Sequence, residues 1–248
     1  MPFSPNHCLP LSTGGGGDKA GSRVFPCLED LLAYYGRTAP DRAAILALNR
    51  PPVTYGTLWV RANDTVRALR SLGVGRSDRV AVVLPDGPET ALAIIAVAAG
   101  AVCVPLNPGF TADEWHRYLA DLRVAALLTR ADMDTASRGA AHTLGIPVID
   151  LSPRPDEGAG AFSLVGSVPS RAVRSGLAAG GADHAFILLT SGSTSRPKMV
   201  PLTQAGVCLS AHNVGATLAL GSQDRLLNVL PLFHAHGLFS GLLAALAA

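Results

Sequence analysis

Short apolar runs alternate with helical patterns between residues 79 and 150, and this alternation limits the chain to few folds. Each run is apolar throughout, as expected of a strand that is covered on both faces of its sheet. Strands are predicted at residues 79–84, 101–105, 124–129 and 146–150, with helices between them at 88–99, 111–122 and 132–144. The pattern predicts an α/β fold, a doubly wound and mostly parallel sheet with flanking helices.

Composition restricts the compartment and the partners. Hydrophobic residues make up 48% of the chain, which is enough for a large core. The net charge is +2 and no run of Lys or Arg occurs, so neither nucleic acid nor an anionic membrane is a predicted partner. The longest apolar run, residues 91–106, is too short and too interrupted for a membrane span. The N-terminus lacks a signal-peptide pattern, which favours the cytoplasm.

The four cysteines are widely separated in the sequence. They are Cys8, Cys27, Cys103 and Cys208, and no two of them form a C-x-x-C pair. This spacing predicts buried or incidental thiols in a reducing compartment, and not a disulfide framework or a zinc site.

Four regions are predicted along the chain. Residues 1–22 are rich in Pro, Gly and Ser and predict a flexible tail. Residues 23–150 form a first α/β unit, which begins with a helix from Cys27 to Pro40, a strand at 43–48 and a helix capped by Thr54. Residues 151–182 are interpreted as a connection without a strand or helix. Residues 183–248 begin a second α/β unit, starting with a strand at 185–189.

A hydroxyl-rich segment directly follows the strand predicted at 185–189. From residue 190 to 198 it reads Thr-Ser-Gly-Ser-Thr-Ser-Arg-Pro-Lys. Consecutive backbone N–H groups in a tight turn make an anion-binding concavity, hydroxyls donate to phosphate oxygens, and a lysine adds positive charge. The segment therefore predicts polyphosphate binding, with a Ser/Gly surface loop without function as the alternative on composition alone.

A Walker A loop is excluded, although Gly192 and Lys198 have its spacing. Pro197 stands where that loop needs glycine, and Met199 stands where it needs a magnesium-binding Ser or Thr.

Residues 190–200 resemble the phosphate-binding signature of the acyl-adenylate-forming superfamily, T-S-G-[ST]-T-G-x-P-K-G-V. This superfamily holds acyl-CoA synthetases, peptide-synthetase adenylation domains and firefly luciferase. Ser195 and Met199 replace the two later glycines of the signature, and Ser195 restricts the turn because it lacks the conformational freedom of glycine. The segment is similar to that of oxalyl-CoA synthetase-like members.

A second segment, residues 228–237, reads Asn-Val-Leu-Pro-Leu-Phe-His-Ala-His-Gly. It resembles the family's next motif, an apolar strand ending in Pro-Leu-Phe-His-x-x-Gly, whose histidine lies near the acyl substrate and the adenylate. Without the resemblance, the alternative is that His234 and His236 are two histidines at the start of a helix and have no function. A metal site is not predicted, because no further clustered ligands accompany the pair. The resemblance covers residues 25–248.

The resemblance implies ATP-dependent activation of a carboxylic acid to acyl-AMP, followed by transfer to coenzyme A. ATP, Mg²⁺ and coenzyme A are the implied cofactor and co-substrates, and the magnesium-binding acid lies outside this chain. The implied ATP-binding residues are Thr190, Ser191, Gly192, Ser193, Thr194, Ser195 and Lys198. The implied catalytic residues are His234 and Lys198.

Members of the superfamily are much longer, so the resemblance is to their N-terminal portion. The Y-G-x-T-E segment, the ribose-binding aspartate and the C-terminal domain with the adenylation lysine have no counterpart here. We therefore expect the missing C-terminal portion to be a partner, and little or no adenylation activity from the chain alone. The acid is a small dicarboxylate, another short acid or a medium-chain fatty acid. The alternatives are an enzyme that loads a carrier protein, or a truncated, non-catalytic ATP-binding remnant.

Overall fold

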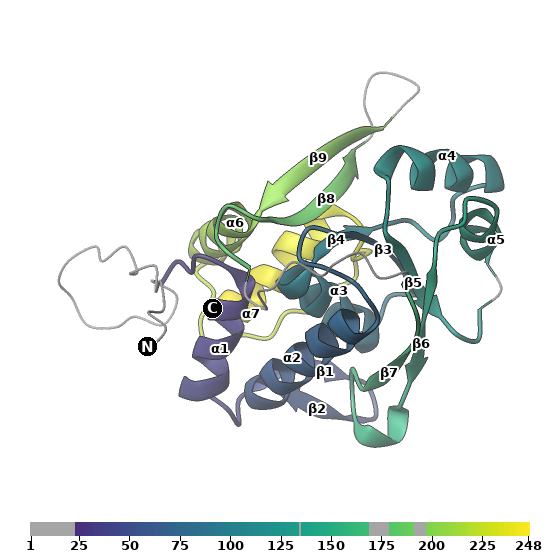
Figure 1. The fold of residues 1–248 in the computed structure, drawn as a ribbon. Helices are drawn as coiled ribbons and strands as arrows, with labels where there is room; N and C mark the ends of the chain where they lie inside the picture. Colours follow the sequence, from purple (N-terminus) through teal and green to yellow (C-terminus); the bar gives the residue numbers. More distant parts are fainter. Residues whose placement is uncertain (1–22, 134, 169–178, 191–196) are drawn as a thin grey trace, which may run out of the picture.

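A computed structural model describes residues 23–133, 135–168, 179–190 and 197–248 (Figure 1). The predicted tail, Cys8 and residues 191–196 of the predicted phosphate segment lie outside these ranges.

The centre of the molecule is a seven-stranded sheet with the strand order β7-β6-β5-β3-β4-β8-β9. Its strands are β3 (Arg79–Val83), β4 (Val102–Pro105), β5 (Ala126–Arg130), β6 (Val148–Pro153), β7 (Phe162–Gly166), β8 (His184–Thr190) and β9 (Lys198–Thr203). The inner strands from β6 to β8 are parallel, and the edge strands β7 and β9 are antiparallel to their neighbours. The predicted mostly parallel sheet is confirmed.

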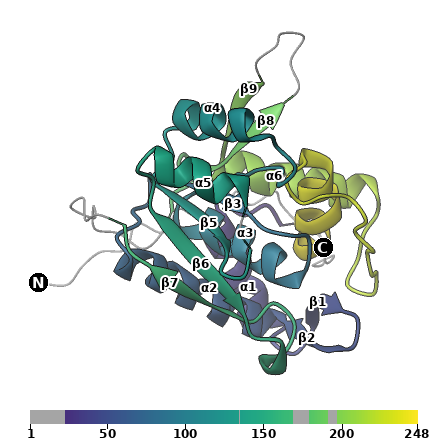
Figure 2. The same cartoon turned by 90° about the vertical axis from the view of Figure 1, so that its right-hand side faces the viewer.

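Helices cover both faces of the sheet (Figures 1 and 2). One face packs against α1 (Leu28–Thr38), α2 (Tyr55–Ser71) and α3 (Pro88–Gly100), and the other against α4 (Ala112–Leu122) and α5 (Ala136–Thr143). The position of strand β3 between two cores explains why its sequence is apolar throughout. Val80 and Val82 enter the core on the α2–α3 face, whereas Ala81 and Val83 enter the core around Trp115 of α4.

Local sequence signals place the starts of two helices. The Thr54 hydroxyl accepts a hydrogen bond of 3.2 Å from the N–H of Thr57 at the start of α2. At the start of α4, Thr111 and Glu114 form a reciprocal capping box. Both bonds satisfy N–H groups that have no partner within the helix. The N-cap predicted at Thr54 is confirmed, and Thr111 is the N-cap of the helix predicted at 111–122.

A separate two-stranded antiparallel hairpin lies beside the main sheet. It consists of β1 (Ala43–Ala47) and β2 (Arg50–Thr54). The strand at 43–48 was expected from its apolar run. The sequence does not predict β2, because prolines 51 and 52 disfavour a strand except at a sheet edge.

The prediction that residues 151–182 hold no strand or helix is wrong. Strand β6 extends to Pro153, a short 3-10 helix η1 covers Pro155–Glu157, and β7 pairs with β6. Strand β7 has an exposed side, and Val165 on it is 63% exposed, so the strand lacks the continuous apolar run of its inner neighbours. Strand β8 pairs with β4, so both predicted units contribute to one sheet. The division of the chain at 150 and 183 stays a prediction.

Beyond β9 the chain forms α6 (Gln204–Thr217), then an extended segment, a π-helix η2 (His236–Leu243) and α7 (Ala244–Ala247). The apolar strand expected at the start of the 228–237 motif is absent from the described structure, since residues 225–229 pair with no described strand. A strand needs a neighbour for its backbone groups, and no described element supplies one here. In the described ranges, every helix is too short or too polar to cross a membrane.

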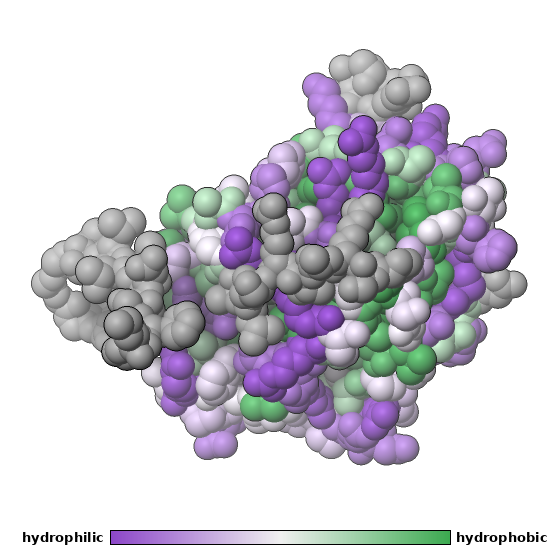
Figure 3. Space-filling view, viewed as in Figure 1, coloured by the Kyte–Doolittle hydropathy of each residue, from purple (hydrophilic) through white to green (hydrophobic). Residues whose placement is uncertain are grey.

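The surface seen in Figure 3 mixes polar and apolar residues. Hydrophobic atoms gather on the right-hand part of this view, over strands β5 and β6.

Candidate functional site

The order of the parallel strands marks a crevice at one edge of the sheet. From β3 the chain passes through α3 to β4 on one side, then through α4 on the opposite face to β5 on the other side of β3. The direction of winding thus reverses at β3, which has β4 on one side and β5 on the other. In open α/β sheets, ligands bind outside the carboxyl ends of the strands at such a switch point.

Asp86 follows β3 at this edge and binds the second signature. Its Oδ1 accepts a hydrogen bond of 2.9 Å from the backbone N–H of Leu232. This contact brings residues 231–234, the Pro-Leu-Phe-His of the motif, to the carboxyl end of β3. The sequence did not reveal Asp86, because its partner lies 146 residues away and the switch point depends on the pairing order of the strands.

His234 lies in the turn between the extended segment and η2. Its N–H donates to Pro231 O at 3.1 Å, and its carbonyl accepts the N–H of Leu238 at 2.9 Å. The imidazole is exposed, and its centre lies 4.5 Å from that of the Phe233 ring. No hydrogen bond or ion pair joins this side chain to Thr190 or Lys198 in the described structure. His236 is also exposed, and no group of three or more His, Cys, Asp or Glu that could hold a metal occurs among the described residues.

Two glycines allow η2 to pack closely on the segment before it. A Cβ on Gly237 would stand 2.3 Å from Pro231 O, and one on Gly241 would stand 2.4 Å from Asn228 Oδ1. Asn228 also donates from Nδ2 to Gly237 O at 3.2 Å. The glycine of the motif is therefore required by close packing, and the π-helix that contains it is a form often found at functional sites.

The β8–β9 hairpin brings the two ends of the predicted phosphate segment together. Thr190 and Lys198 face each other in the antiparallel ladder, and the Thr190 hydroxyl makes a long hydrogen bond of 3.5 Å to Lys198 O. Both residues are exposed. Because β8 runs parallel to β4, Thr190 lies at the same carboxyl edge as Asp86. Phe186 of β8 also contacts Phe239 of η2, with ring centres 6.5 Å apart.

Gln204 fixes the point where β9 becomes α6. Its fully buried side chain donates to Ala98 O of α3 at 2.6 Å and accepts the N–H of Leu28 of α1 at 3.1 Å. The neighbouring Thr203 caps α6 by accepting the N–H of Gly206. The strand that leaves the predicted phosphate segment is thus anchored to two other helices.

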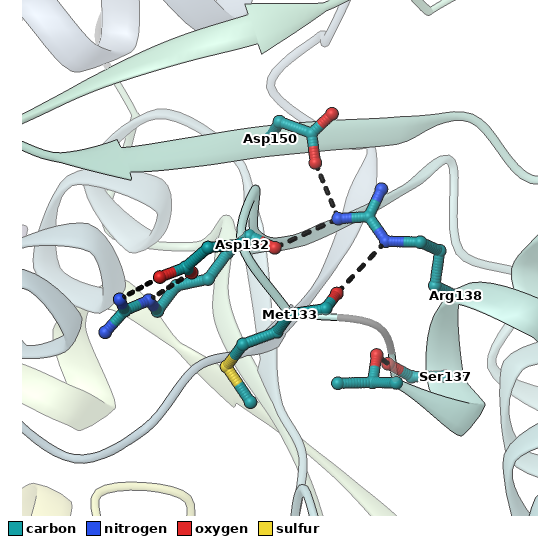
Figure 4. Close-up of polar contacts among 7 residues, drawn as sticks. Asp132, Met133, Ser137, Arg138 and Asp150 are labelled. Atoms are coloured by element: carbon teal, nitrogen blue, oxygen red, sulfur yellow. Dashed lines mark hydrogen bonds and ion pairs between the residues drawn. The ribbon is translucent and has the colours of Figure 1, made fainter.

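The polar side chains between α5 and strands β5 and β6 form hydrogen bonds and ion pairs with one another (Figure 4). Arg138 of α5 donates to Asp150 Oδ1 at 2.6 Å and to Arg130 O at 3.0 Å. The Arg130 guanidinium donates to Asp132 and lowers the pKa of that carboxyl. These contacts fasten α5 to β5 and β6, which is a structural role.

The family described as "AMP-binding enzyme" matches residues 33–248. The chain belongs to the AMP-binding enzyme family. Its α/β fold is that of the family, and its relatives include acid–CoA ligases.

Two curated relatives of this AMP-binding chain are plant ligases. It is 36% identical over 235 residues to "Probable CoA ligase CCL9" from Humulus lupulus, covering 89% of this chain and 42% of that protein. It is 34% identical over 226 residues to "Oxalate--CoA ligase" from Arabidopsis thaliana, covering 89% and 43%. The chain therefore spans less than half the length of these relatives.

The solved structure of apo MatB from Rhodopseudomonas palustris shares the fold of this AMP-binding chain. The TM-score is 0.72 at 24% identity, with 90% of this chain and 43% of that chain covered. Individual roles for Thr190, Lys198 and His234 stay predictions.

Proposed function

We propose that this chain supplies the polyphosphate-binding hairpin, and part of the acid-binding site, of a ligase that joins a carboxylic acid to coenzyme A. A carboxylate oxygen attacks the α-phosphorus of ATP, the bond to the β-phosphate breaks, and pyrophosphate leaves. The sulfur of coenzyme A then attacks the acyl carbonyl, AMP leaves, and the thiol proton passes to solvent.

One observation supports the proposal: residues of both family signatures lie at the carboxyl edge of the same sheet. The first arrives through Thr190 at the end of β8, and the second through Leu232 bound to Asp86. Phosphoryl transfer depends on positioning and charge neutralisation more than on covalent help from the protein. Two segments anchored at one edge, through Thr190 and through Leu232, fit that requirement.

Within this proposal each residue has a separate role. Thr190 and residues 191–194 bind the β- and γ-phosphates through backbone N–H groups and hydroxyls. Lys198 adds a positive charge near the departing pyrophosphate, and Ser195 lies in the same segment. His234, exposed at the turn before η2, borders the acid. Mg²⁺, when bound, neutralises phosphate charge. The described residues offer no acid cluster for it.

The acid is proposed to be a small dicarboxylate. The phosphate segment resembles that of oxalyl-CoA synthetase-like members, and a relative at 34% identity is named oxalate–CoA ligase. We place the reaction in the cytoplasm, where ATP and coenzyme A are supplied. Assays with coenzyme A and with a carrier protein as alternative thiol acceptors separate this proposal from the carrier-loading one.

The test compares ATP binding with turnover. Equilibrium dialysis should show that the 248-residue chain binds ATP, and that Lys198→Ala weakens binding about tenfold, the effect of losing roughly 1.4 kcal/mol. Lys19→Ala, at the only other lysine, is the matched control. In the complete Arabidopsis relative, replacing the lysine that matches Lys198 should slow acid-dependent ATP–pyrophosphate exchange.

Two results would count against the proposal. One is an unchanged exchange rate in the substituted relative. The other is that Lys198→Ala binds ATP with the same affinity as the parent chain. We further expect no exchange activity from the 248-residue chain alone, and measurable acyl-AMP formation by it would contradict that expectation.

A further inference from the structure

Strand β7 forms one edge of the seven-stranded sheet, and its outer side has no partner strand in the part of the chain that the structure describes. It pairs antiparallel with β6 through residues 162–166, and these residues make no other backbone hydrogen bond to a described residue. Every second residue of an edge strand points its N–H and C=O groups outward. The outer side of β7 can therefore accept a further strand.

The two edges of the sheet differ in the residues that discourage such pairing. Edge strands are usually protected by charged side chains, above all Lys, or by Pro. Strand β9, at the other edge, has Lys198 at its start and Pro201 in its interior. Strand β7 reads Phe-Ser-Leu-Val-Gly and has neither a charged residue nor a proline. The edge at β7 is thus open to pairing, whereas the edge at β9 is protected.

An exposed apolar side chain lies on this open edge strand. Phe162 and Leu164 pack against the core on the α2–α3 side of the sheet, so Ser163 and Val165 face the opposite side. Val165 is 63% exposed. Figure 3 shows hydrophobic atoms gathered over the neighbouring strands β5 and β6. A partner at β7 would remove the valine, together with the free backbone groups, from water.

The sequence of β7 is complementary to itself in an antiparallel pair. With a two-fold axis at Leu164, Phe162 lies opposite Gly166 of the other copy. Ser163 then lies opposite Val165. An aromatic ring beside a glycine is a favourable pair across two strands, and no like charges meet in this register. The acidic η1 turns of the two copies lie at opposite ends of the paired strands, so they do not repel each other at close range.

We propose that β7 is a self-association surface, through which two copies of this chain pair antiparallel and join their sheets. A two-fold contact uses the same patch on both copies, and this is the commonest arrangement of protein dimers. Five paired residues make a small contact, so the dimer forms reversibly. The β8–β9 hairpin lies at the other end of the strand order, at the top of Figure 1, so pairing at β7 leaves the candidate site accessible.

The test measures the mass of the 248-residue chain by sedimentation equilibrium over a wide range of concentration. The mass should rise from 25.5 kDa towards twice that value, and hydrogen exchange at residues 163–165 should slow as it rises. Ser163→Lys with Val165→Lys places like charges opposite each other and should weaken association about tenfold. The control is Val60→Lys with Leu209→Lys, at helix positions that are 53% and 47% exposed, and should associate as the parent does.

A variant pair of opposite charge tests the register of the contact. Ser163→Glu with Val165→Glu should also associate weakly on its own. An equimolar mixture of the Lys and Glu variants should recover the dimer, because opposite charges then face each other on the two strands. Circular dichroism establishes that all variants are folded.

Three results would overturn the proposal. The first is that the chain stays monomeric at every concentration. The second is that the Lys variant at residues 163 and 165 associates as strongly as the control at residues 60 and 209. The third is that the mixed Lys and Glu variants associate no better than either variant alone, because β7 then does not pair with its own copy.

Discussion

Asp86 accepts a hydrogen bond from the backbone N–H of Leu232, a residue 146 positions further along the chain. This bond joins the loop after β3 to the motif that contains His234. Leu232 is buried, so without Asp86 its N–H would lose its partner in a site with little water.

Replacing Asp86 should therefore loosen the second signature. Asp86→Ala should lower the free energy of unfolding by about 1 kcal/mol, the usual contribution of such a bond. Asp86→Asn keeps an acceptor oxygen and should stay close to the parent. Urea unfolding gives the energies, and hydrogen exchange at Leu232 reports the bond itself. Equal exchange at Leu232 in all three proteins would contradict the prediction.

Gln204 should be among the most sensitive polar positions. Gln204→Leu keeps roughly the same volume but leaves Leu28 N–H and Ala98 O without their partner. Two buried groups left unsatisfied should cost about 2 to 4 kcal/mol of unfolding free energy. Gln223→Leu, at an exposed position, is the matched control and should change little. If Gln204→Leu lost less unfolding free energy than Gln223→Leu, these two hydrogen bonds would make no net contribution to stability.

Gly237 and Gly139 should respond to alanine in opposite directions. The Cβ of Gly237→Ala would meet Pro231 O at 2.3 Å, so the helix must shift, at a cost of about 1 to 3 kcal/mol. Gly139 lies within α5 with nothing within 4 Å of an added Cβ. Gly139→Ala should therefore stabilise by about 0.5 to 1 kcal/mol. Thermal unfolding measures both, and destabilisation by both variants would refute the steric distinction.

Glu114 should make stability depend on pH. Hydrogen bonds from the Thr111 N–H and hydroxyl lower the pKa of this carboxyl below its ordinary 4.5. A lowered folded-state pKa stabilises the protein above the unfolded pKa, and this contribution is lost as the pH falls through the folded value. The Tm difference between the parent and Glu114→Gln should thus be largest near pH 7 and vanish in acid. If the Tm difference between the two proteins grew below pH 4, its pH dependence would have the opposite sign. The capping box would then not be the source of the difference.

The three described cysteines should resist thiol reagents. Burial raises the pKa of Cys27 and of Cys208 to about 12, and that of Cys103 well above its ordinary value. Little thiolate is then present at pH 8, and thiolate is the reactive form. A Cys8→Ser variant should react slowly with a disulfide reagent until guanidinium unfolds it. Fast reaction of the folded variant would place at least one of these thiols at the surface.

The sequence predicted most of the sheet because its inner strands are covered on both faces. Val80 to Val83 face two cores, so every position is apolar and the strand stands out. Thr54 and Thr111 marked helix starts because their side chains bond to nearby N–H groups. Strands β2, β7 and β9 were missed because an edge strand or a small hairpin needs no continuous apolar run.

The candidate site was only partly predictable. Thr190, Lys198 and His234 came from local motifs, whereas Asp86 and Gln204 act on residues 146 and 176 positions away. Such long-range bonds depend on the strand order, which local patterns do not contain. The strand expected at the start of the second motif did not form for the same reason, since local apolar residues say nothing of where a neighbouring strand lies.

The buried amide of Gln204 has a mechanical consequence. One side chain bonds the start of α6 both to α1 and to the end of α3, so it couples the three helices. We expect a displacement of β9 caused by binding at its far end to reach the first helix of the chain, where a spectroscopic probe on α1 would detect it.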